Sequence, residues 1–182
     1  NIESIGDVNV GATVSFLNAG EDNACVVTTS HKARCWGENT FGHLGTGNTT
    51  PIGNSGANTI ASMVNIPLTA DVVRINANNE VVCVVTEAAG GRCWGYGENG
   101  RLGTGNTNNQ GDDAGEMAAL TDIDIEAPDD TIDSSDQIVA DIINIHHTTC
   151  AISTAGKVKC WGVNDRGAGG YGDSLESVSY TH

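Results

Sequence analysis

The clearest structural signal in the chain is the segment Cys83-Val-Val-Thr-Glu-Ala-Ala-Gly-Gly-Arg-Cys93-Trp94-Gly95. The same motif, two cysteines separated by nine residues and followed by Trp-Gly, occurs three times. The other copies begin at Cys25 and Cys150, and the three together contain all six cysteines and all three tryptophans of the 182 residues. Self-similarity of this kind is typical of a repeat architecture, in which one supersecondary unit is copied and stacked.

The copies remain similar after each Trp-Gly pair, where glycines recur at matching positions. The first two share the run Leu-Gly-Thr-Gly-Asn-Thr at 44–49 and 102–107, whereas the third has Gly169 in place of the leucine. The first cysteines of successive copies are 58 and 67 residues apart, which suits a unit of several strands. We therefore expect an all-β chain in three parts: residues 1–49 with a lead-in strand and the first repeat, 50–107 with the second, and 108–182 with an acidic connection, the third repeat and a tail.

The spacing within each copy predicts a β-hairpin. If the two cysteines face each other across an antiparallel pair, a three-residue loop remains, at 29–31 in the first copy and at 154–156 in the third. The third loop ends in Gly156, and a three-residue loop needs a left-handed residue there. Opposed residues have Cβ atoms about 4.5–5.5 Å apart and a disulfide needs about 3.5–4.5 Å, so the closer kind of pair just accepts a bridge. The predicted disulfides are Cys25–Cys35, Cys83–Cys93 and Cys150–Cys160.

Two other interpretations of the cysteines stay open. Structural zinc sites usually space their ligands two to four residues apart and recruit histidines at set intervals, whereas here the gap is nine residues and the five histidines are scattered. Buried, reduced cysteines are the second alternative. Opposed cysteines in every repeat favour oxidation, and hence an extracellular or periplasmic location.

The composition is strongly acidic, with 8 Lys and Arg against 23 Asp and Glu, a formal charge of −15 and a pI near 4.3. Such a surface repels nucleic acid and anionic membranes, which are bound chiefly through their phosphates, so we expect neither partner. Apolar residues make up 38% of the chain, and no run approaches the roughly 18 residues needed to cross a bilayer. The simplest interpretation of the charge is solubility.

Much of this charge lies in the long connection at 108–136. No Lys or Arg occurs from 103 to 156. Clustered carboxylates suggest calcium, because hard cations take oxygen ligands, but the spacing matches no known calcium loop and charge runs are usually solvated. The acidic residues are Asp112, Asp113, Glu116, Asp122, Asp124, Glu126, Asp129, Asp130, Asp133 and Asp136.

The segments 25–49, 83–107 and 150–174 resemble the repeat of the regulator of chromosome condensation family. In that family each repeat contributes a four-stranded blade to a β-propeller, typically of seven blades, and the resemblance implies three such blades, as an open arc or as part of a larger ring. It also implies that the Trp-Gly and Leu-Gly positions pack blade against blade. These residues are Trp36, Trp94, Trp161, Leu44 and Leu102. The paired cysteines are similar to those of secreted bacterial members.

Candidates for chemistry are few. His146 and His147 precede the third hairpin, and as members of a strand they would point to opposite faces. The simpler interpretation is that both are surface or loop histidines. We predict no catalytic residues, no cofactor and no bound metal, and no enzymatic activity. Asn48-Thr49-Thr50 is a glycosylation sequon, which predicts a surface position for Asn48.

Three blades cannot close a ring, and an open array leaves strand edges and apolar faces that natural proteins cover. A copy of the chain placed directly after His182 would put its first cysteine 57 residues after Cys150, so we expect a whole number of repeats. The first hypothesis is a secreted or cell-surface structural protein, fibre-forming or otherwise assembled, whose partners are copies of itself or further repeats. The alternative is a binding module, adhesin-like or inhibitor-like, that recognises a protein or a glycan through its rim loops.

Overall fold

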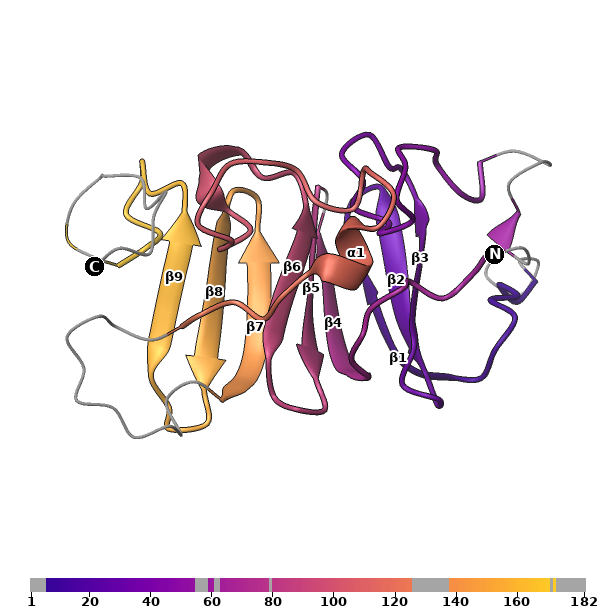
Figure 1. The fold of residues 1–182 in the computed structure, drawn as a ribbon, viewed down its shortest axis with the longest axis horizontal. Coiled ribbons are helices and arrows are strands. Elements are labelled where there is room, and N and C mark those ends of the chain that lie inside the picture. The colour runs from indigo at the N-terminus through magenta and orange to yellow at the C-terminus, as the bar shows by residue number, and fades with distance from the viewer. Residues whose placement is uncertain are drawn as a thin grey trace.

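The computed structural model describes residues 6–54, 59–60, 63–78, 80–125, 138–170 and 172, which form three antiparallel sheets. Each sheet has three strands in sequence order, and Figure 1 shows the sheets side by side. This confirms the predicted all-β fold of three antiparallel units, which we call blades. Blade 1 is β1 (Val14–Ala19), β2 (Asn23–Thr28) and β3 (Ala33–Gly37); blade 2 is β4 (Val72–Asn78), β5 (Val81–Thr86) and β6 (Gly91–Gly95); blade 3 is β7 (Val139–Ile145), β8 (Thr148–Ser153) and β9 (Val158–Gly162).

The second and third strands of each blade form the predicted hairpin. Cysteine lies opposite cysteine in every blade. A backbone hydrogen bond, from Thr28 N to Lys32 O at 2.9 Å in blade 1 and at the equivalent positions in the other blades, closes a loop of three residues. The last loop residue has a left-handed backbone each time, at His31 (φ 60°), Ala89 (φ 62°) and Gly156 (φ 81°). Only the third copy uses the residue type that adopts this conformation without strain. The turn geometry is therefore imposed by the paired strands and not by the loop residue alone.

The first strand of each blade carries an irregularity at the same place. Its pairing with the second strand shifts by one residue between Val72 and Arg74 in blade 2, and at the equivalent positions in the other blades. A bulge of this kind increases the local twist and bends the strand. Its recurrence gives the three blades the same shape, which lets them stack in the same way.

The resemblance implied four-stranded blades, and the described residues differ from that expectation. In place of a fourth strand, single antiparallel bridges join Gly37 to Ile52 in blade 1 and Gly95 to Gln110 in blade 2. Pro51 lacks a backbone N–H and Gly53 has a positive φ of 91°, so the segment around Ile52 cannot extend its pairing.

The apolar core lies between the blades, in two clusters. One cluster fills the space between blades 1 and 2 and the other the space between blades 2 and 3, so blade 2 contributes to both. The first contains Cys25, Val27, Ala33, Cys35, Leu44, Ile66, Val72, Ile75, Ala77, Val82, Val84, Trp94, Met117 and Leu120. The second contains Val81, Cys83, Val85, Cys93, Leu102, Ile123, Ile125, Val139, Ile142, Ala151 and Trp161. Stability therefore depends on contacts between neighbouring blades, as in other repeat proteins.

The acidic connection is more than a solvated charge run. Its short helix α1 (Glu116–Ala119) places Met117 in the first cluster, and Ile123 and Ile125 lie in the second. Figure 1 shows α1 and the chain that follows it crossing in front of the sheets. The segment therefore bridges both blade interfaces. The other helical segment is the 3₁₀ turn η3 (Glu98–Gly100).

The calcium hypothesis for this connection gains no support from the described residues. Residues 126–137, with five of the ten acidic positions, lie outside them. Among the residues that the structure does describe, no group of three or more His, Cys, Asp or Glu side chains is placed to hold a metal ion. No helix formed by these residues has the length and apolar character needed to cross a bilayer.

Candidate interaction surface

Each blade has two faces, which we name by the order of the chain. The leading face is turned toward the preceding blade, and in blade 2 it carries Val84 and Trp94, which lie in the first cluster. The trailing face is turned toward the following blade, and in blade 2 it carries Cys83 and Val85, which lie in the second cluster. Residues at equivalent repeat positions take the same face in blades 1 and 3, so exposed and covered faces are compared position by position.

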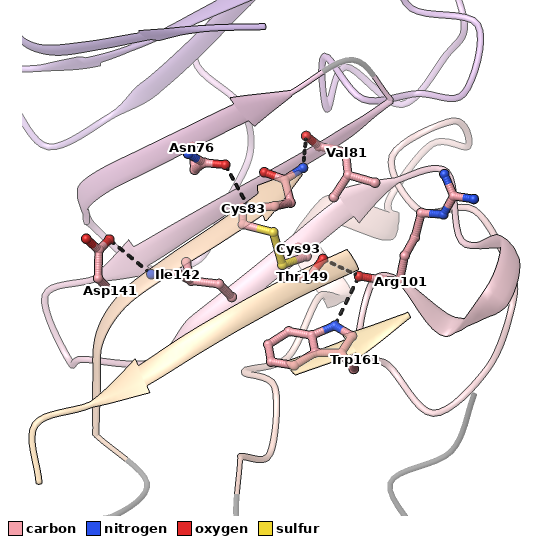
Figure 2. Close-up of a disulfide and its surroundings, with 10 residues drawn as sticks. Asn76, Val81, Cys83, Cys93, Arg101, Asp141, Ile142, Thr149 and Trp161 are labelled. Atoms are coloured by element: carbon pink, nitrogen blue, oxygen red, sulfur yellow. Dashed lines mark hydrogen bonds between the residues drawn. A yellow bond between two sulfur atoms is a disulfide. The ribbon is translucent and has the colours of Figure 1, made fainter. Parts of the chain in front are cut away.

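A tryptophan joins the leading face of blade 2 to blade 1, and another joins the leading face of blade 3 to blade 2. Trp94 Nε1 donates to the backbone oxygen of His43 at 3.0 Å, and Trp161 Nε1 donates to the backbone oxygen of Arg101 at 3.0 Å. Figure 2 shows the second of these bonds, beside the Cys83–Cys93 disulfide. Both indoles are no more than 1% exposed, so each satisfies its only polar atom within the interface.

Two recurring glycines make room for these indoles. A Cβ atom on Gly45 would lie 3.0 Å from Trp94 Nε1, and one on Gly103 would lie 2.9 Å from Trp161 Nε1. Both glycines also have positive φ, of 68° and 71°. Larger residues at these positions would be strained and would push the indole away. Leu44 and Leu102, which precede the glycines, are fully buried in the two clusters.

The disulfides lie on the trailing faces. The structure bridges Cys25 to Cys35, Cys83 to Cys93 and Cys150 to Cys160. The cysteines of the first two bridges are no more than 1% exposed, because the next blade covers them. Both cysteines of the third bridge are only half-buried. The difference follows from the position of blade 3, whose trailing face has no described neighbour.

The trailing face of blade 3 exposes four large apolar side chains. Ile143, Ile145, Ile152 and Val158 are 45%, 60%, 39% and 66% exposed. A hollow of about 660 Å³ opens on this side, lined by Ile143, Ile145, Cys150, Val163 and Ala168 among others. Contiguous exposed apolar surface of this kind marks interaction sites.

The two histidines beside this hollow are exposed turn residues. His146 and His147 form the turn between β7 and β8. His146 has a positive φ of 52°, and both residues line the hollow. They are therefore the surface and loop histidines that the simpler interpretation expected. The strand placement, with side chains on opposite faces, is not found, because the hairpin needs a tight turn immediately before Thr148.

The leading face of blade 1 is the second open face. Leu17 is 60% exposed there, whereas the equivalent residues Ile75 and Ile142 are each 2% exposed. Trp36 is half-buried, in contrast to the other two tryptophans. The two ends of the described array therefore expose the two halves of an interface that occurs twice inside it.

Charged groups line the blade interfaces at their rims. His43 is fully buried, with Nε2 3.2 Å from a carboxylate oxygen of Glu38. Burial lowers the pKa of His43, and the nearby carboxylates only partly oppose this effect. At the equivalent position in blade 2, Arg101 donates to Glu80 at 3.0 Å and lies 4.6 Å above the Tyr96 ring. Burial likewise lowers the pKa of Arg101, and Glu80 opposes it.

Sequence reasoning missed one buried polar residue that shapes these loops. Asn39 is fully buried, and its Nδ2 donates to the backbone oxygens of Asn48 and Thr50 at 2.7 and 3.1 Å. Its Oδ1 accepts from Leu44 N at 2.8 Å. Asn164 holds the same place in blade 3, but blade 2 has glycine there, so the pattern was hidden in a three-way comparison. Asn48 itself is exposed, as the sequon requires.

Comparisons with known proteins identify the repeat. Residues 14–42 match the family model described as the regulator of chromosome condensation (RCC1) repeat. Human WBSCR16 is similar in structure, with a TM-score of 0.69 and 16% identity over 92% of this chain and 37% of that one. Yeast RCC1 (Prp20) bound to Kap60 has a TM-score of 0.64 and 15% identity over 92% of this chain and 36% of that one.

A further structure of Prp20p from Saccharomyces cerevisiae, described with its binding to Gsp1p and histones, has a TM-score of 0.64 and 15% identity over 91% of this chain and 37% of that one. The chain therefore spans little more than a third of the length of these solved proteins. No curated protein matches the sequence. At these identities the likeness shows the propeller fold alone.

Proposed function

We propose that this chain, of which residues 14–42 match the regulator of chromosome condensation repeat, is a non-catalytic structural module of a secreted or cell-surface protein, in which further repeats cover its open blade faces. The observation that carries this proposal is the exposed trailing face of blade 3. Its disulfide is half-buried, whereas the equivalent bridges in blades 1 and 2 are sealed by the next blade. The same repeat positions are therefore interface positions elsewhere in the chain.

The extracellular part of the proposal is supported by the three disulfides. All six cysteines of the chain are bridged, and no cysteine of the structure is free. Disulfides in every repeat are typical of oxidising compartments. The charge of −15 favours solubility and disfavours contact with nucleic acid or anionic lipid.

Hydroxyl-radical footprinting of the natural protein, isolated from its source, tests this function. Ile145 and Val158 are 60% and 66% exposed on the trailing face of blade 3, and Val64, at 69%, lies on the connection between blades 1 and 2 and serves as the internal reference. We expect Ile145 and Val158 to be modified far less than Val64, because further repeats cover them. Equal modification of all three residues would show that the face is open in the natural protein and would reject the proposal.

A second candidate function, recognition of a protein or glycan, is favoured by a different feature. A depression of about 370 Å³ at one end of the first strands is lined by Asn18, Asn76, Asn78 and Asn144, among others. Asn144 is 4% exposed, and its Oδ1 has no hydrogen-bond partner in the described structure. The side-chain amides that line the depression carry donors and acceptors of the kind that bind glycan hydroxyls and peptide groups. Binding of a glycan or peptide that is lost on Asn144→Ala and kept in Asn106→Ala, an exposed loop variant, would favour this candidate.

A further inference from the structure

We infer that copies of this chain stack head to tail, with the leading face of blade 1 in one copy packed against the trailing face of blade 3 in the next. This rests on the proposed function and names the partner of the same exposed face. The two faces are the two halves of an interface that the chain already forms between blades 1 and 2 and between blades 2 and 3. The series therefore continues from one copy into another in the same register.

The acceptor position of the tryptophan hydrogen bond is exposed in blade 3. The acceptors for Trp94 and Trp161 are the backbone oxygens of His43 and Arg101, and the residue at this repeat position in blade 3 is Ala168. Ala168 is exposed and lines the hollow. The half-buried Trp36 of a second copy is the equivalent donor. The side chain at the acceptor position is immaterial, because the bond is to the main chain.

The space for this indole is open in blade 3. Gly45 and Gly103 are in contact with the tryptophans of the next blade, and their equivalent is Gly170. Gly170 has the same positive φ, 74°, and no atom of the residues that the structure describes lies within 4 Å of the place where its Cβ would be. The loop is therefore already shaped as in the two occupied interfaces.

The contact between copies would bury apolar side chains on both faces. Inside the chain, Asn18 Oδ1 accepts from Ala77 N at 2.8 Å and Asn76 Oδ1 accepts from Asn144 N at 3.0 Å. Blade 3 has Ile143 in place of Asn18 and Asn76. The interface between copies would therefore lack this hydrogen bond and would bury the Ile143 side chain in its place. Leu17 of the second copy takes the place of Ile75 and Ile142, facing the exposed isoleucines and the half-buried disulfide. Burial of such side chains contributes about 25 cal/mol for each Å² removed from water.

The rims of the two exposed faces carry opposite charges. Between blades 1 and 2, Phe41 of the trailing side stacks on Tyr96 of the leading side, with ring centroids 4.2 Å apart. The residue equivalent to Phe41 in blade 3 is Arg166, and the residue equivalent to Tyr96 in blade 1 is Glu38. Arg166 is exposed, and the Glu38 side chain is 41% exposed. Stacking in the same register therefore brings an arginine and a carboxylate together, where the internal interface has an aromatic pair.

An interface of this kind joins two different surfaces. Such heterologous contacts close into a ring when the rotation between copies allows it, and otherwise extend into a filament. The charge of −15 on every copy opposes association at low ionic strength, and salt screens this repulsion. Self-association is therefore expected to strengthen as salt is raised toward physiological values.

The test is a charge swap on the purified full chain, followed by sedimentation velocity over a range of concentrations in 150 mM salt. Arg166→Glu and Glu38→Arg are each expected to weaken self-association about 3- to 10-fold, since each puts like charges together, and the double variant is expected to restore it. Glu87→Arg, which reverses a 52% exposed carboxylate on blade 2, is the matched control and should leave association unchanged. Circular dichroism of each variant establishes that the fold is intact.

A chain that stays monomeric at all concentrations overturns head-to-tail stacking, as does a double variant that associates no better than the single ones. These outcomes are distinct from failure of the proposed function. If footprinting shows Ile145 and Val158 protected in the natural protein while the charge swap gives no rescue, the face is covered by something other than Glu38 and Trp36 of a second copy. The structural role would then stand, and this arrangement would be rejected.

Discussion

Blade 2 and blade 3 have the same hairpin but different neighbours. Val85 in blade 2 is 3% exposed, whereas Ile152 at the equivalent place in blade 3 is 39% exposed. Gly91 is buried, whereas its equivalent Val158 is 66% exposed. Strand lengths, register and disulfide are otherwise matched. A blade therefore has almost no core of its own. Its apolar residues become buried only when another blade packs against them.

The largest difference between the two blades is expected when a charge is placed on the trailing face. Val85→Lys buries an unpaired ammonium group in the second cluster and should lower the free energy of unfolding by about 4 kcal/mol or more. Ile152→Lys leaves the ammonium group in water and should cost about 1 kcal/mol or less. Urea unfolding followed by tryptophan fluorescence measures both. Equal losses would mean that the trailing face of blade 3 is already covered in the isolated chain.

A tryptophan truncation compares the leading faces in the same way. Trp94→Ala removes a fully buried indole and its bond to His43 O, and should cost about 3–5 kcal/mol. Trp36→Ala removes a half-buried indole and should cost less than half as much. Thermal unfolding by differential scanning calorimetry gives the two values. A loss from Trp36→Ala as large as that from Trp94→Ala would contradict the open leading face of blade 1.

The rate of reduction is expected to differ between the disulfides, because they are buried to different extents. Cys150–Cys160 is half-buried and should react first with a small thiol reductant, whereas Cys83–Cys93 is sealed and should react only on opening of the blade interface. Loss of one bridge is expected to cost about 2–4 kcal/mol. Alkylation and peptide mass spectrometry at successive times give the order. Simultaneous reduction of both bridges in folded protein would contradict a covered second bridge.

The smallest predicted effect concerns pH and separates the two internal interfaces. Burial lowers the pKa of His43, so the folded state keeps this histidine neutral while the unfolded state is protonated below about pH 6.5. The unfolded state then binds more protons, and stability falls as the pH drops below 6.5, by about 1.4 kcal/mol for each pH unit over which only the unfolded state is protonated. Arg101, at the equivalent place between blades 2 and 3, does not titrate in this range.

Urea midpoints between pH 7.5 and 5.5 measure this dependence. His43→Gln should flatten the slope, even if the variant is less stable overall, because the residue that loses its proton on folding is gone. His31→Gln is the matched control, since His31 is 46% exposed and lies in a hairpin loop. Unchanged slopes in both variants would place the pH dependence elsewhere.

The sequence predicted the hairpins because their signal is local. Two cysteines separated by nine residues, with a turn at the midpoint, specify one antiparallel register, and the structure has that register in all three blades. The blade interfaces were predicted only through family resemblance, because the tryptophan bonds end on backbone oxygens. A hydrogen bond to a backbone oxygen requires no particular residue type at the acceptor position. The bond between Trp161 and Arg101 O therefore has no sequence signature beyond the repeat spacing.

The acidic connection shows the opposite limit. Its carboxylates dominate the composition of 108–136 and hid four apolar residues that anchor the segment. Counting charges predicts a solvated loop, but burial depends on which few residues point inward. Asp122, which suggested a cation ligand, instead accepts from Arg92 Nε at 2.7 Å. The buried residues are Met117, Leu120, Ile123 and Ile125.

The indole contact has a consequence for how such proteins evolve. Blades 2 and 3 each attach to the previous one through a main-chain oxygen and a glycine, and the side chain at the acceptor position differs between them, His43 in one case and Arg101 in the other. For this contact, gene duplication or deletion of a whole repeat therefore requires no matching substitution in the neighbouring blade. The number of repeats can change while the indole contact is kept.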